Sequence, residues 1–294
     1  MKFNIYSDIK AFYQANYDIL MRHEVQNLIP LGNIIMGNAD KDRTEWRDPA
    51  NWFMATITDG ADNGIKLTAV MTPPFGITLY MTDNQTDSAA LDCLVDGLLA
   101  ENIPVSGVMT EKSLAEDFAQ AYTKATGMGQ RINTSLRIYE LLKVNPEIPI
   151  IGKMRLVEES DMHFLPYWRE AMAYDFFGTP IVIQSDAEVY RRLIDKRYIY
   201  ILEDNGIPVT TAHAGRRMQN VSGIAGVYTP PYFRGKGYAT SCVAQLSQLM
   251  LDKGFIRCAL YTDLANPTSN SIYQKIGYTP ICDSLDIKFE TPQG

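Results

Sequence analysis

Residues 223–240 carry the clearest chemical signal in the chain, and they read GIAGVYTPPYFRGKGYAT. A short apolar segment ends at Pro230-Pro231, and the run RGKGYA from Arg234 to Ala239 follows it. Apolar residues then recur at helical spacing as far as Met250. A strand, a glycine-rich turn and a helix start in this order aim backbone N–H groups at one point, where the helix dipole adds partial positive charge. The turn is therefore predicted to bind an anion, most simply a phosphate or a pyrophosphate.

Two well-known phosphate-binding turns do not fit this run. A P-loop requires G-x-x-x-x-G-K-[ST], and neither Gly-Lys-Ser nor Gly-Lys-Thr occurs in the chain. A dinucleotide-binding turn requires a third small residue where Thr240 stands. The pattern that remains is [QR]-x-x-G-x-[GA], which Arg234, Gly237 and Ala239 satisfy. Strand, loop and helix resemble the acetyl-CoA pyrophosphate loop of the GNAT acyltransferase superfamily.

A second segment supports this resemblance. Residues 266–278 read NPTSNSIYQKIGY, in which Asn266 is a good N-cap, Pro267 suits the first helical position and Gly277 suits the end of a helix. The run resembles the second GNAT signature, N-x(6)-Y-x(3)-G-[FY], at the expected distance after the loop. The resemblance implies an α/β (α+β) fold, in which a mixed, largely antiparallel twisted sheet is flanked by helices.

The resemblance also assigns roles to residues of the loop and strand. The backbone N–H groups of Gly235, Gly237 and Ala239, with Thr240, are expected to hold the pyrophosphate of acetyl-CoA. Arg234 either contacts phosphate or orders the loop, and Lys236 faces solvent. The backbone of the strand is expected to hold the pantetheine arm, and Asn266 either caps its helix or contacts the pantetheine amides. The complete set of predicted coenzyme-binding residues is Val227, Tyr228, Thr229, Arg234, Gly235, Lys236, Gly237, Tyr238, Ala239, Thr240, Asn266, Asn270 and Tyr273.

Tyr273 is the predicted catalytic residue. In GNAT enzymes the matching tyrosine lies near the thioester sulfur, and a phenol with a pKa of about 10 can return a proton to a departing thiolate. A core position beside Ile272 and Ile276 is the simpler alternative. The strand contains no Glu or Asp to act as general base, and four residues or a water chain remain open for that role: Glu203, His213, Tyr228 and Asp263.

Composition limits the class of protein. The net charge of −7 disfavours nucleic acid as the main partner. The four cysteines are widely spaced and suggest free thiols in a reducing compartment rather than disulfides. No metal site is expected from their spacing or from the three histidines. The first residues lack a signal-peptide core, and no apolar run reaches about 18 residues. We expect a cytoplasmic protein that does not bind membranes.

Apolar spacing predicts similar elements in the two halves. In the first half we expect helices over 3–29 that end near Pro30 and Gly32, a polar loop over 38–48, a hairpin of strands 52–58 and 65–71, a strand 76–80, a helix from 87, a strand 105–109 and a helix with a Ser113/Glu116 capping box. In the second half we expect a strand 154–157, helices around 164–172 and 187–194, a hairpin of strands 198–203 and 207–213, the strand, loop and helix of the first motif, a strand 255–262, a helix from 266 and terminal strands within 281–289.

The matching order indicates two tandem GNAT-like domains, 1–145 and 146–294, joined near the Pro-rich residues 145–149. In the first half, the loop equivalent to the pyrophosphate loop is YMTDNQTD, from Tyr80 to Asp87. It contains no glycine or arginine, and its carboxylates would repel a diphosphate. We therefore predict that the second half alone binds coenzyme and that the first half contributes shape or part of an acceptor pocket.

The predicted function is an acetyl-CoA-dependent N-acetyltransferase whose acceptor is a primary amine of a small molecule, an amino acid or a peptide. The alternative is a non-catalytic acyl-CoA-binding regulator or scaffold, in which the acceptor site has decayed. The sequence does not indicate the identity of the acceptor, the preferred acyl chain or the oligomeric state.

Overall fold

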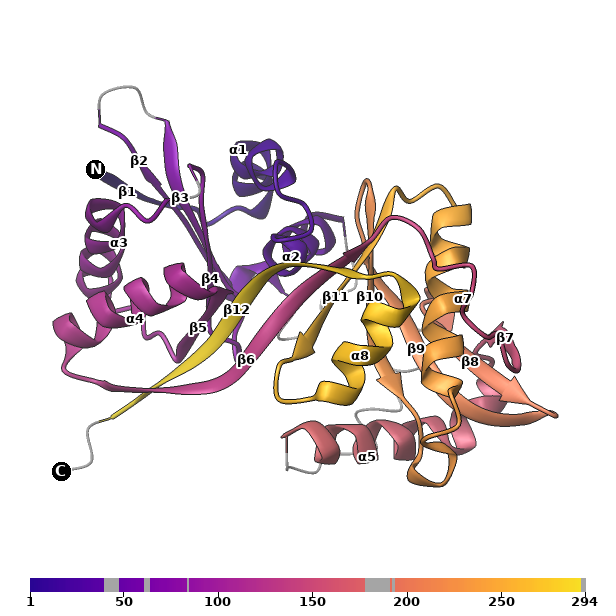
Figure 1. Cartoon of the computed structure of the whole chain (residues 1–294). Helices are drawn as coiled ribbons and strands as arrows, with labels where there is room; N and C mark the ends of the chain where they lie inside the picture. Colours follow the sequence, from indigo (N-terminus) through magenta and orange to yellow (C-terminus); the bar gives the residue numbers. More distant parts are fainter. Residues whose placement is uncertain (40–47, 61–63, 84, 178–190, 192–193, 292–294) are drawn as a thin grey trace. The chain divides into compact units, whose positions relative to one another are not determined.

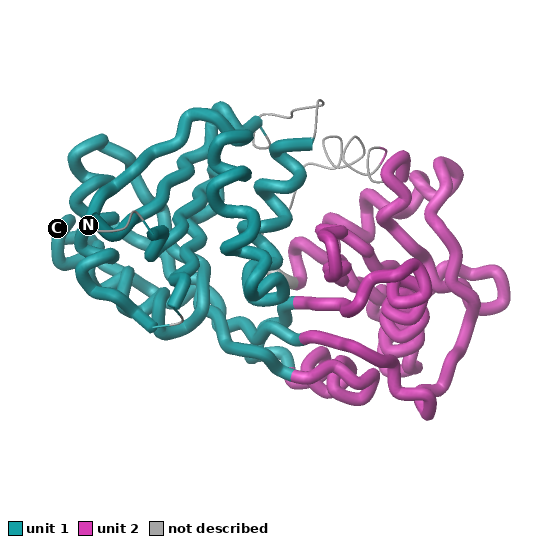
Figure 2. The backbone as a smooth tube through the Cα atoms, turned by 90° about the horizontal axis from the view of Figure 1, so that it is seen from above, with its two compact units in different colours: residues 1–139, 261–266, 280–294 teal, residues 140–260, 267–279 magenta. Residues whose placement is uncertain are grey.

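The computed structural model describes residues 1–39, 48–60, 64–83, 85–177, 191 and 194–291 (Figure 1). The chain forms two compact units, which Figure 2 shows in different colours. Unit 1 comprises residues 1–139, 261–266 and 280–294, and unit 2 comprises residues 140–260 and 267–279. The chain first passes from unit 1 to unit 2 close to the predicted boundary at 145/146. It later returns twice to unit 1, so the two units are not two consecutive stretches of sequence.

The sheet of unit 1 runs in the order β1-β2-β3-β4-β5-β12-β6. The bounds are β1 Lys2–Ile5, β2 Phe53–Thr58, β3 Ile65–Met71, β4 Ile77–Met81, β5 Gly107–Glu111, β6 Gly129–Leu141 and β12 Thr279–Glu290. The first four strands are antiparallel, whereas β4 and β5 are parallel and share the register pair Ile77↔Val108. The hairpin of β2 and β3 is as predicted.

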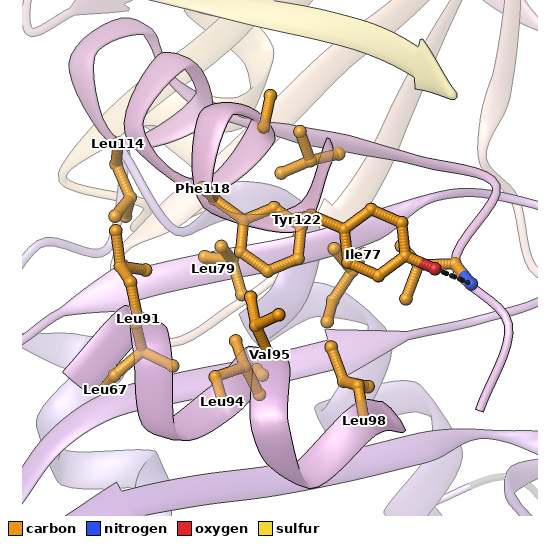
Figure 3. Close-up of a cluster of buried hydrophobic side chains, with 14 of the residues drawn as sticks. Leu67, Ile77, Leu79, Leu91, Leu94, Val95, Leu98, Leu114, Phe118 and Tyr122 are labelled. Carbon is orange, nitrogen blue, oxygen red and sulfur yellow. Dashed lines mark hydrogen bonds between the residues drawn. The ribbon is translucent and has the colours of Figure 1, made fainter. Parts of the chain in front are cut away.

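Helices cover both faces of this sheet. Helices α3 (Ser88–Ala100) and α4 (Lys112–Thr126) pack on one face, where leucines, Phe118 and Tyr122 form a continuous core (Figure 3). The hydroxyl of Tyr122 accepts a hydrogen bond from the Val105 N–H. Helices α1 (Ile9–Met21) and α2 (Leu28–Ala39) contact β2 and β4, and the Thr68 hydroxyl donates to Asn16 on their side. All six residues of β2 are buried because both faces are covered.

The sheet of unit 2 runs in the order β7-β8-β9-β10-β11. The bounds are β7 Lys153–Leu156, β8 Ile199–Asp204, β9 Ile207–Arg217, β10 Val221–Tyr228 and β11 Arg257–Asp263, of which residues 261–263 belong to unit 1. The turn between β8 and β9 has Asn205 and Gly206 in the left-handed region, as the predicted Asn-Gly hairpin requires. Strands β7 to β10 are antiparallel, and β11 is parallel to β10.

Unit 2 also has helices on both faces. Helix α5 (Leu165–Phe177) follows the 3-10 turn η3 (Glu159–His163), and its Leu165 packs on Ile199 and Ile201. Helix α7 (Tyr238–Asp252) contacts the sheet and α8 (Pro267–Ile276). Tyr200, which alternates with Ile199 and Ile201 along β8, accepts a hydrogen bond from Lys253 just after α7. Because alternate residues of a strand point to opposite faces, α5 and α7 cover opposite faces of the sheet.

The two units repeat one order of elements. Each has four antiparallel strands, a helix after the fourth strand, a parallel fifth strand and a helix after it. The predicted fold class, with largely antiparallel mixed sheets flanked by helices, is confirmed. Strand β12, which follows the last helix of the second repeat, pairs with β5 of unit 1, so the final strand of the chain completes the sheet of unit 1.

Several local predictions for the first half are wrong. The helix expected to end near Pro30 and Gly32 in fact begins at Leu28, because proline is tolerated in the first turn, where its missing N–H has no partner. The Ser113/Glu116 capping box does not form, since Glu111 caps α4 two residues before Ser113. The edge strand β1 and the long strand β6 were not expected. The loop over 38–48 and the helix around 187–194 lie largely outside the described residues.

The four cysteines, Cys93, Cys242, Cys258 and Cys282, are free, as predicted. Among the helices that the structure describes, none has the length and apolar character needed to cross a bilayer. Within the same residues, no three His, Cys, Asp or Glu side chains gather as metal ligands.

Candidate functional site

The predicted anion-binding turn lies between β10 and α7 in unit 2 (Figure 1). The Pro230-Pro231 break forms the short 3-10 turn η4 (Pro231–Phe233), and α7 begins at Tyr238. Gly235 and Gly237 adopt left-handed conformations, with φ of 76° and 83°. An added Cβ would meet no atom closer than 3.5 Å at either glycine, so backbone conformation rather than space requires glycine at both places.

The N-terminus of α7 is open. Its N-cap residue is Gly237, which has no side chain, and no side chain among the described residues caps the helix. The first helical hydrogen bond runs from the Ser241 N–H to the Gly237 carbonyl, at 3.0 Å. The preceding N–H groups of the first turn are therefore available to a ligand. Left-handed glycines followed by an uncapped helix form the kind of backbone concavity that accepts phosphate oxygens.

Arg234 orders this turn. Its Nε donates to the Thr229 carbonyl at 2.8 Å, and one terminal nitrogen donates to Asp175 of α5 at 2.6 Å. The guanidinium also lies 5.8 Å from the centre of the Tyr228 ring. These contacts fasten the turn to the end of β10 and to α5. Of the two roles predicted for Arg234, loop ordering is the one that the geometry shows, and a phosphate contact stays a prediction.

The remaining loop residues are at the surface or half buried. The Lys236 ammonium lies 4.7 Å from the centre of the Tyr232 ring and is exposed, in agreement with its predicted orientation toward solvent. The Tyr238 hydroxyl donates to Asp204 at 2.5 Å, which holds the start of α7 against β8. This hydrogen bond raises the pKa of Tyr238. Ala239 and Thr240 are half buried in the first turn of α7.

Strand β10 separates from its parallel neighbour before it reaches the turn. The register with β11 covers Val221 to Gly223, and the residues after Gly223 have no partner in that register. On its other edge, β10 has a register shift against β9 between Ala225 and Tyr228. Gly226 lies within this bulge, with φ of 58°. The half-buried Val227 and Thr229 follow it, so the edge of β10 next to the loop is open to an extended ligand.

His213 supports this bulge from β9. A Cβ on Gly226 would lie 2.7 Å from His213 Nδ1, so the imidazole occupies the space that a side chain would need. Burial, and then the charge of Arg169 on α5, lower the pKa of His213 to about 4. The imidazole is therefore neutral at physiological pH. Sequence reasoning placed Gly226 in a strand but did not anticipate the bulge or its histidine neighbour.

Tyr273 is buried in α8, with 9% of its surface exposed, and its ring lies edge-on to Tyr278 at 5.9 Å. Burial raises the pKa of Tyr273 to about 12, which makes it a weaker acid than a tyrosine in water. Burial also raises the pKa of the Cys242 and Cys258 thiols to about 12. The phenol of Tyr273 and these two thiols therefore hold their protons with similar strength.

The four candidates for general base have other roles in the structure. Glu203 forms a salt bridge with Arg155 at 2.7 Å. Asp263 accepts the Ala265 N–H and shapes the turn after β11. His213 is neutral and buried, and burial raises the pKa of Tyr228. Both carboxylates therefore make structural contacts, and the shifted pKa values of His213 and Tyr228 make neither an efficient base near neutral pH.

The structure places most of the predicted residues in unit 2, but not all of them. The turn 234–240, the end of β10, Asn270 and Tyr273 all belong to unit 2, where α7 packs against β10 and α8. Asn266 stands directly before α8, as predicted, and donates its N–H to the Asp263 carbonyl at 3.1 Å. It belongs to unit 1. Its contact with the pantetheine amides therefore stays a prediction.

Two stabilising contacts of the turn were not foreseen. The Ser241 hydroxyl donates to the Ile151 carbonyl at 2.7 Å and accepts the Ile151 N–H at 2.9 Å, which ties the segment before β7 to α7. Asp175 is the partner of Arg234. Both contacts join residues far apart in the sequence, and no local pattern indicates them.

The segment that contains this turn is similar to a known protein family. Residues 158–278 match the acetyltransferase (GNAT) family model. Over these residues the chain is similar to the GNAT acetyltransferases. The match contains β10, the turn, α8 and the two residues after it, so the resemblance carried by the two sequence motifs is confirmed. No curated protein matches the chain.

Solved structures show that the whole chain has a GNAT-type fold. A Drosophila protein has a TM-score of 0.65 at 12% identity, over 99% of both chains. A GNAT-family acetyltransferase from Colwellia psychrerythraea has a TM-score of 0.56 at 12% identity, over 99% of this chain and 100% of its own. A glucosamine N-acetyltransferase region of a fungal multi-domain β-N-acetylglucosaminidase has a TM-score of 0.55 at 13% identity, over 97% of this chain and 38% of its own.

Proposed function

We propose that unit 2 is an acetyl-CoA-dependent N-acetyltransferase that transfers an acetyl group directly to a primary amine of a small molecule, an amino acid or a peptide. The match to the GNAT family supports acyl transfer. Acetyl-CoA as the donor and a primary amine as the acceptor are our proposal. The observation that carries it is the open N-terminus of α7, preceded by two left-handed glycines at the end of a strand that has left its neighbour.

The diphosphate of the coenzyme would lie on the N–H groups of residues 235–240. Charge-assisted hydrogen bonds to phosphate each contribute about 1.5–3 kcal/mol, and the dipole of α7 acts in the same direction. From there, the pantetheine arm would run along the open edge of β10 and pair with backbone groups of Val227 and Thr229. The bulge at Gly226 turns the backbone at this point, and an N–H near Val227 would polarise the thioester carbonyl.

Tyr273 would return the proton to the departing sulfur. A thiolate released into water, where a thiol has a pKa of about 8.5, would not take a proton from a phenol with a pKa of about 12. A thiolate formed in the buried interior would have a raised pKa as well, as Cys242 and Cys258 do. Proton transfer from Tyr273 is therefore favourable only where water is excluded from the sulfur.

The attacking amine must be neutral, and no described side chain is well suited to take its proton. We propose that water carries this proton away. Glucosamine belongs in the first panel of acceptors, because one fold neighbour is described as a glucosamine N-acetyltransferase region. The free thiols fit the cytoplasm as the proposed location.

Thiol release from acetyl-CoA, measured with a panel of primary amines, tests the proposal. We expect at least one amine to release CoA at a rate above hydrolysis, and Tyr273→Phe to slow that release while CoA affinity is retained. A chain that binds CoA but releases no thiol with any amine would be an acyl-CoA-binding regulator. A chain that binds no CoA would contradict both functions.

A further inference from the structure

Unit 1 contains a cavity of about 300 Å³, at the lower end of the range for small-molecule sites. It lies where β4 and β5 separate, since these strands share the single register pair Ile77↔Val108 and the cavity is lined by residues beyond it, including Thr78 and Met109. Pro30 of α2, Ser113 of α4 and Ser284 of β12 also line it. All of the lining residues belong to unit 1.

Three hydroxyl groups around this cavity donate their protons to backbone carbonyls and so offer a ligand lone pairs only. Thr78 donates to the Val70 carbonyl, Thr110 to the Leu79 carbonyl, and Ser284 to the Thr110 carbonyl, at 2.9, 2.6 and 2.6 Å. A hydroxyl has one proton and two lone pairs, so an oxygen that has already donated can only accept further hydrogen bonds. A ligand that pairs with these oxygens must itself supply N–H or O–H groups.

One carboxylate adds negative charge to the same wall. Oε2 of Glu111 accepts from the Ser113 N–H, the Ser113 hydroxyl and the Leu114 N–H, at 3.1, 2.7 and 3.2 Å. These three bonds fix the side chain at the start of α4. Its Oε1 accepts no hydrogen bond from any residue that the structure describes. The described residues that line the cavity include no lysine, arginine or histidine.

We propose that this cavity is a binding site for a small polar molecule that carries a primary ammonium group. Glu111 is its counter-ion, and the hydroxyl oxygens of Thr78, Thr110 and Ser284 accept its hydrogen bonds. An ammonium group supplies three N–H donors for these oxygens and a positive charge opposite Glu111. A coenzyme A diphosphate does not fit it, because the nearby α3 is already capped by Asp87 and the wall carries no cation. The site is independent of the proposed acetyl transfer.

Calorimetric titration of the full chain with matched pairs tests this site. Each pair differs in one or two ammonium groups: glucosamine and glucose, ethanolamine and ethylene glycol, 1,4-diaminobutane and 1,4-butanediol. We expect at least one amine to bind at least tenfold more tightly than its neutral partner. Glu111→Gln should reduce that preference at least tenfold, because glutamine keeps an oxygen that can cap α4 but removes the charge.

Two more variants locate the site. Met109→Trp, which fills the cavity without a change of charge, should abolish amine binding, and Glu116→Gln, an exposed change on the same helix, should leave it unaltered. Acetyl-CoA binding should be the same in all three variants, so a failure here is distinguishable from a failure of the proposed function. Equal affinity for the members of every pair, or amine binding that persists in both Glu111→Gln and Met109→Trp, would overturn the proposal.

Discussion

Two helices in equivalent places of the two units begin in opposite ways. Helix α3 of unit 1 has Asp87 at its N-cap, and one carboxylate oxygen accepts the N–H groups of Ala89 and Ala90, at 3.0 and 3.2 Å. Helix α7 of unit 2 has Gly237 there and no side-chain cap. In unit 1, the protein's own anion satisfies the helix dipole, whereas unit 2 leaves the same groups for an anion from outside. One repeat has a helix start that its own side chain caps, and the other has an open helix start.

The strands that precede these helices also differ, because one is regular and the other is bulged. Strand β4 pairs with β3 in a regular register from Ile77 to Met81. Strand β10 is bulged against β9, with Gly226 in the left-handed region above His213. The helix that follows also differs, because the residue four places before the closing glycine is Tyr273 in α8 and Thr123 in α4. Loop, strand and helix therefore all differ between the units, and together they give one unit the features expected of a coenzyme site.

The largest effect is expected when a carboxylate is placed at the open start of α7, so that it resembles the start of α3. Gly237→Glu places an anion at the start of α7 and a side chain at φ 83°. We expect CoA affinity to fall more than 100-fold, measured by calorimetry. Gly254→Glu is the matched control, because Gly254 follows α7 with φ of 96° and open space around it. Similar losses of CoA affinity in both variants would show that backbone strain causes the effect, and not a loss of the N–H groups of residues 235–240.

The pH dependence of stability tests whether a neutral, buried His213 lies beneath the bulge of β10, a feature that β4 lacks. The folded pKa of His213, about 4, lies below its unfolded value of about 6.5. Between these values the unfolded chain binds more protons, so this contribution is fully present above pH 6.5 and is lost as the pH falls toward 4. We expect a loss of about 3 kcal/mol from this group, measured by urea unfolding across that range. The slope should flatten in His213→Gln, and an unchanged slope would contradict the burial of a neutral imidazole beneath the bulge.

Tyr273→Phe removes the proposed catalytic acid of α8, which has no counterpart at Thr123 of α4. We expect kcat to fall about 10- to 100-fold with little change in CoA affinity, as removal of a general acid usually does. Since its pKa is about 12, the wild-type rate should not decline below pH 10 through loss of this proton. Steady-state kinetics from pH 6 to 10 measure both. A decline of the wild-type rate as the pH approaches 10 that disappears in the variant would mean that Tyr273 titrates as an exposed tyrosine does.

The smallest effect is expected when the cap of unit 1 is removed. Asp87→Ala deletes the carboxylate that caps α3, and it should destabilise the protein by about 1 kcal/mol in chemical denaturation. CoA affinity should remain that of the wild type, because an open helix start without the glycine turn and the bulge is not a diphosphate site. A second CoA bound by this variant would show that Asp87 alone closes unit 1.

The sequence predicted those parts of the molecule that depend on local chemistry. The glycines of the turn, the start of α8 at Pro267 and the Asp87 cap follow from conformational preferences of single residues. The Asn205-Gly206 hairpin does so too. The general base was left open, and the described residues supply no strong candidate for it.

The parts that were missed depend on partners far along the chain. Strand β1 is four residues long and becomes a strand by pairing with β2, at least 50 residues away. Glu111 displaced the expected capping box because an acidic side chain can cap a helix as a serine does. The bulge at Gly226 depends on His213 of the adjacent strand, and the contact of Arg234 depends on Asp175. Such pairings have no signature within a window of sequence.

The place of β12 has a consequence for synthesis of the protein. Residues Ser284 to Lys288 pair with Gly107 to Glu111, so the sheet of the first unit is unfinished until residues 284–288 have left the ribosome. During that interval β5 presents an unpaired edge, which invites association with other chains. A fragment that stops at residue 145 keeps this edge permanently. Cutting the gene between the two repeats therefore yields an incomplete product on the N-terminal side, however well the cut is placed.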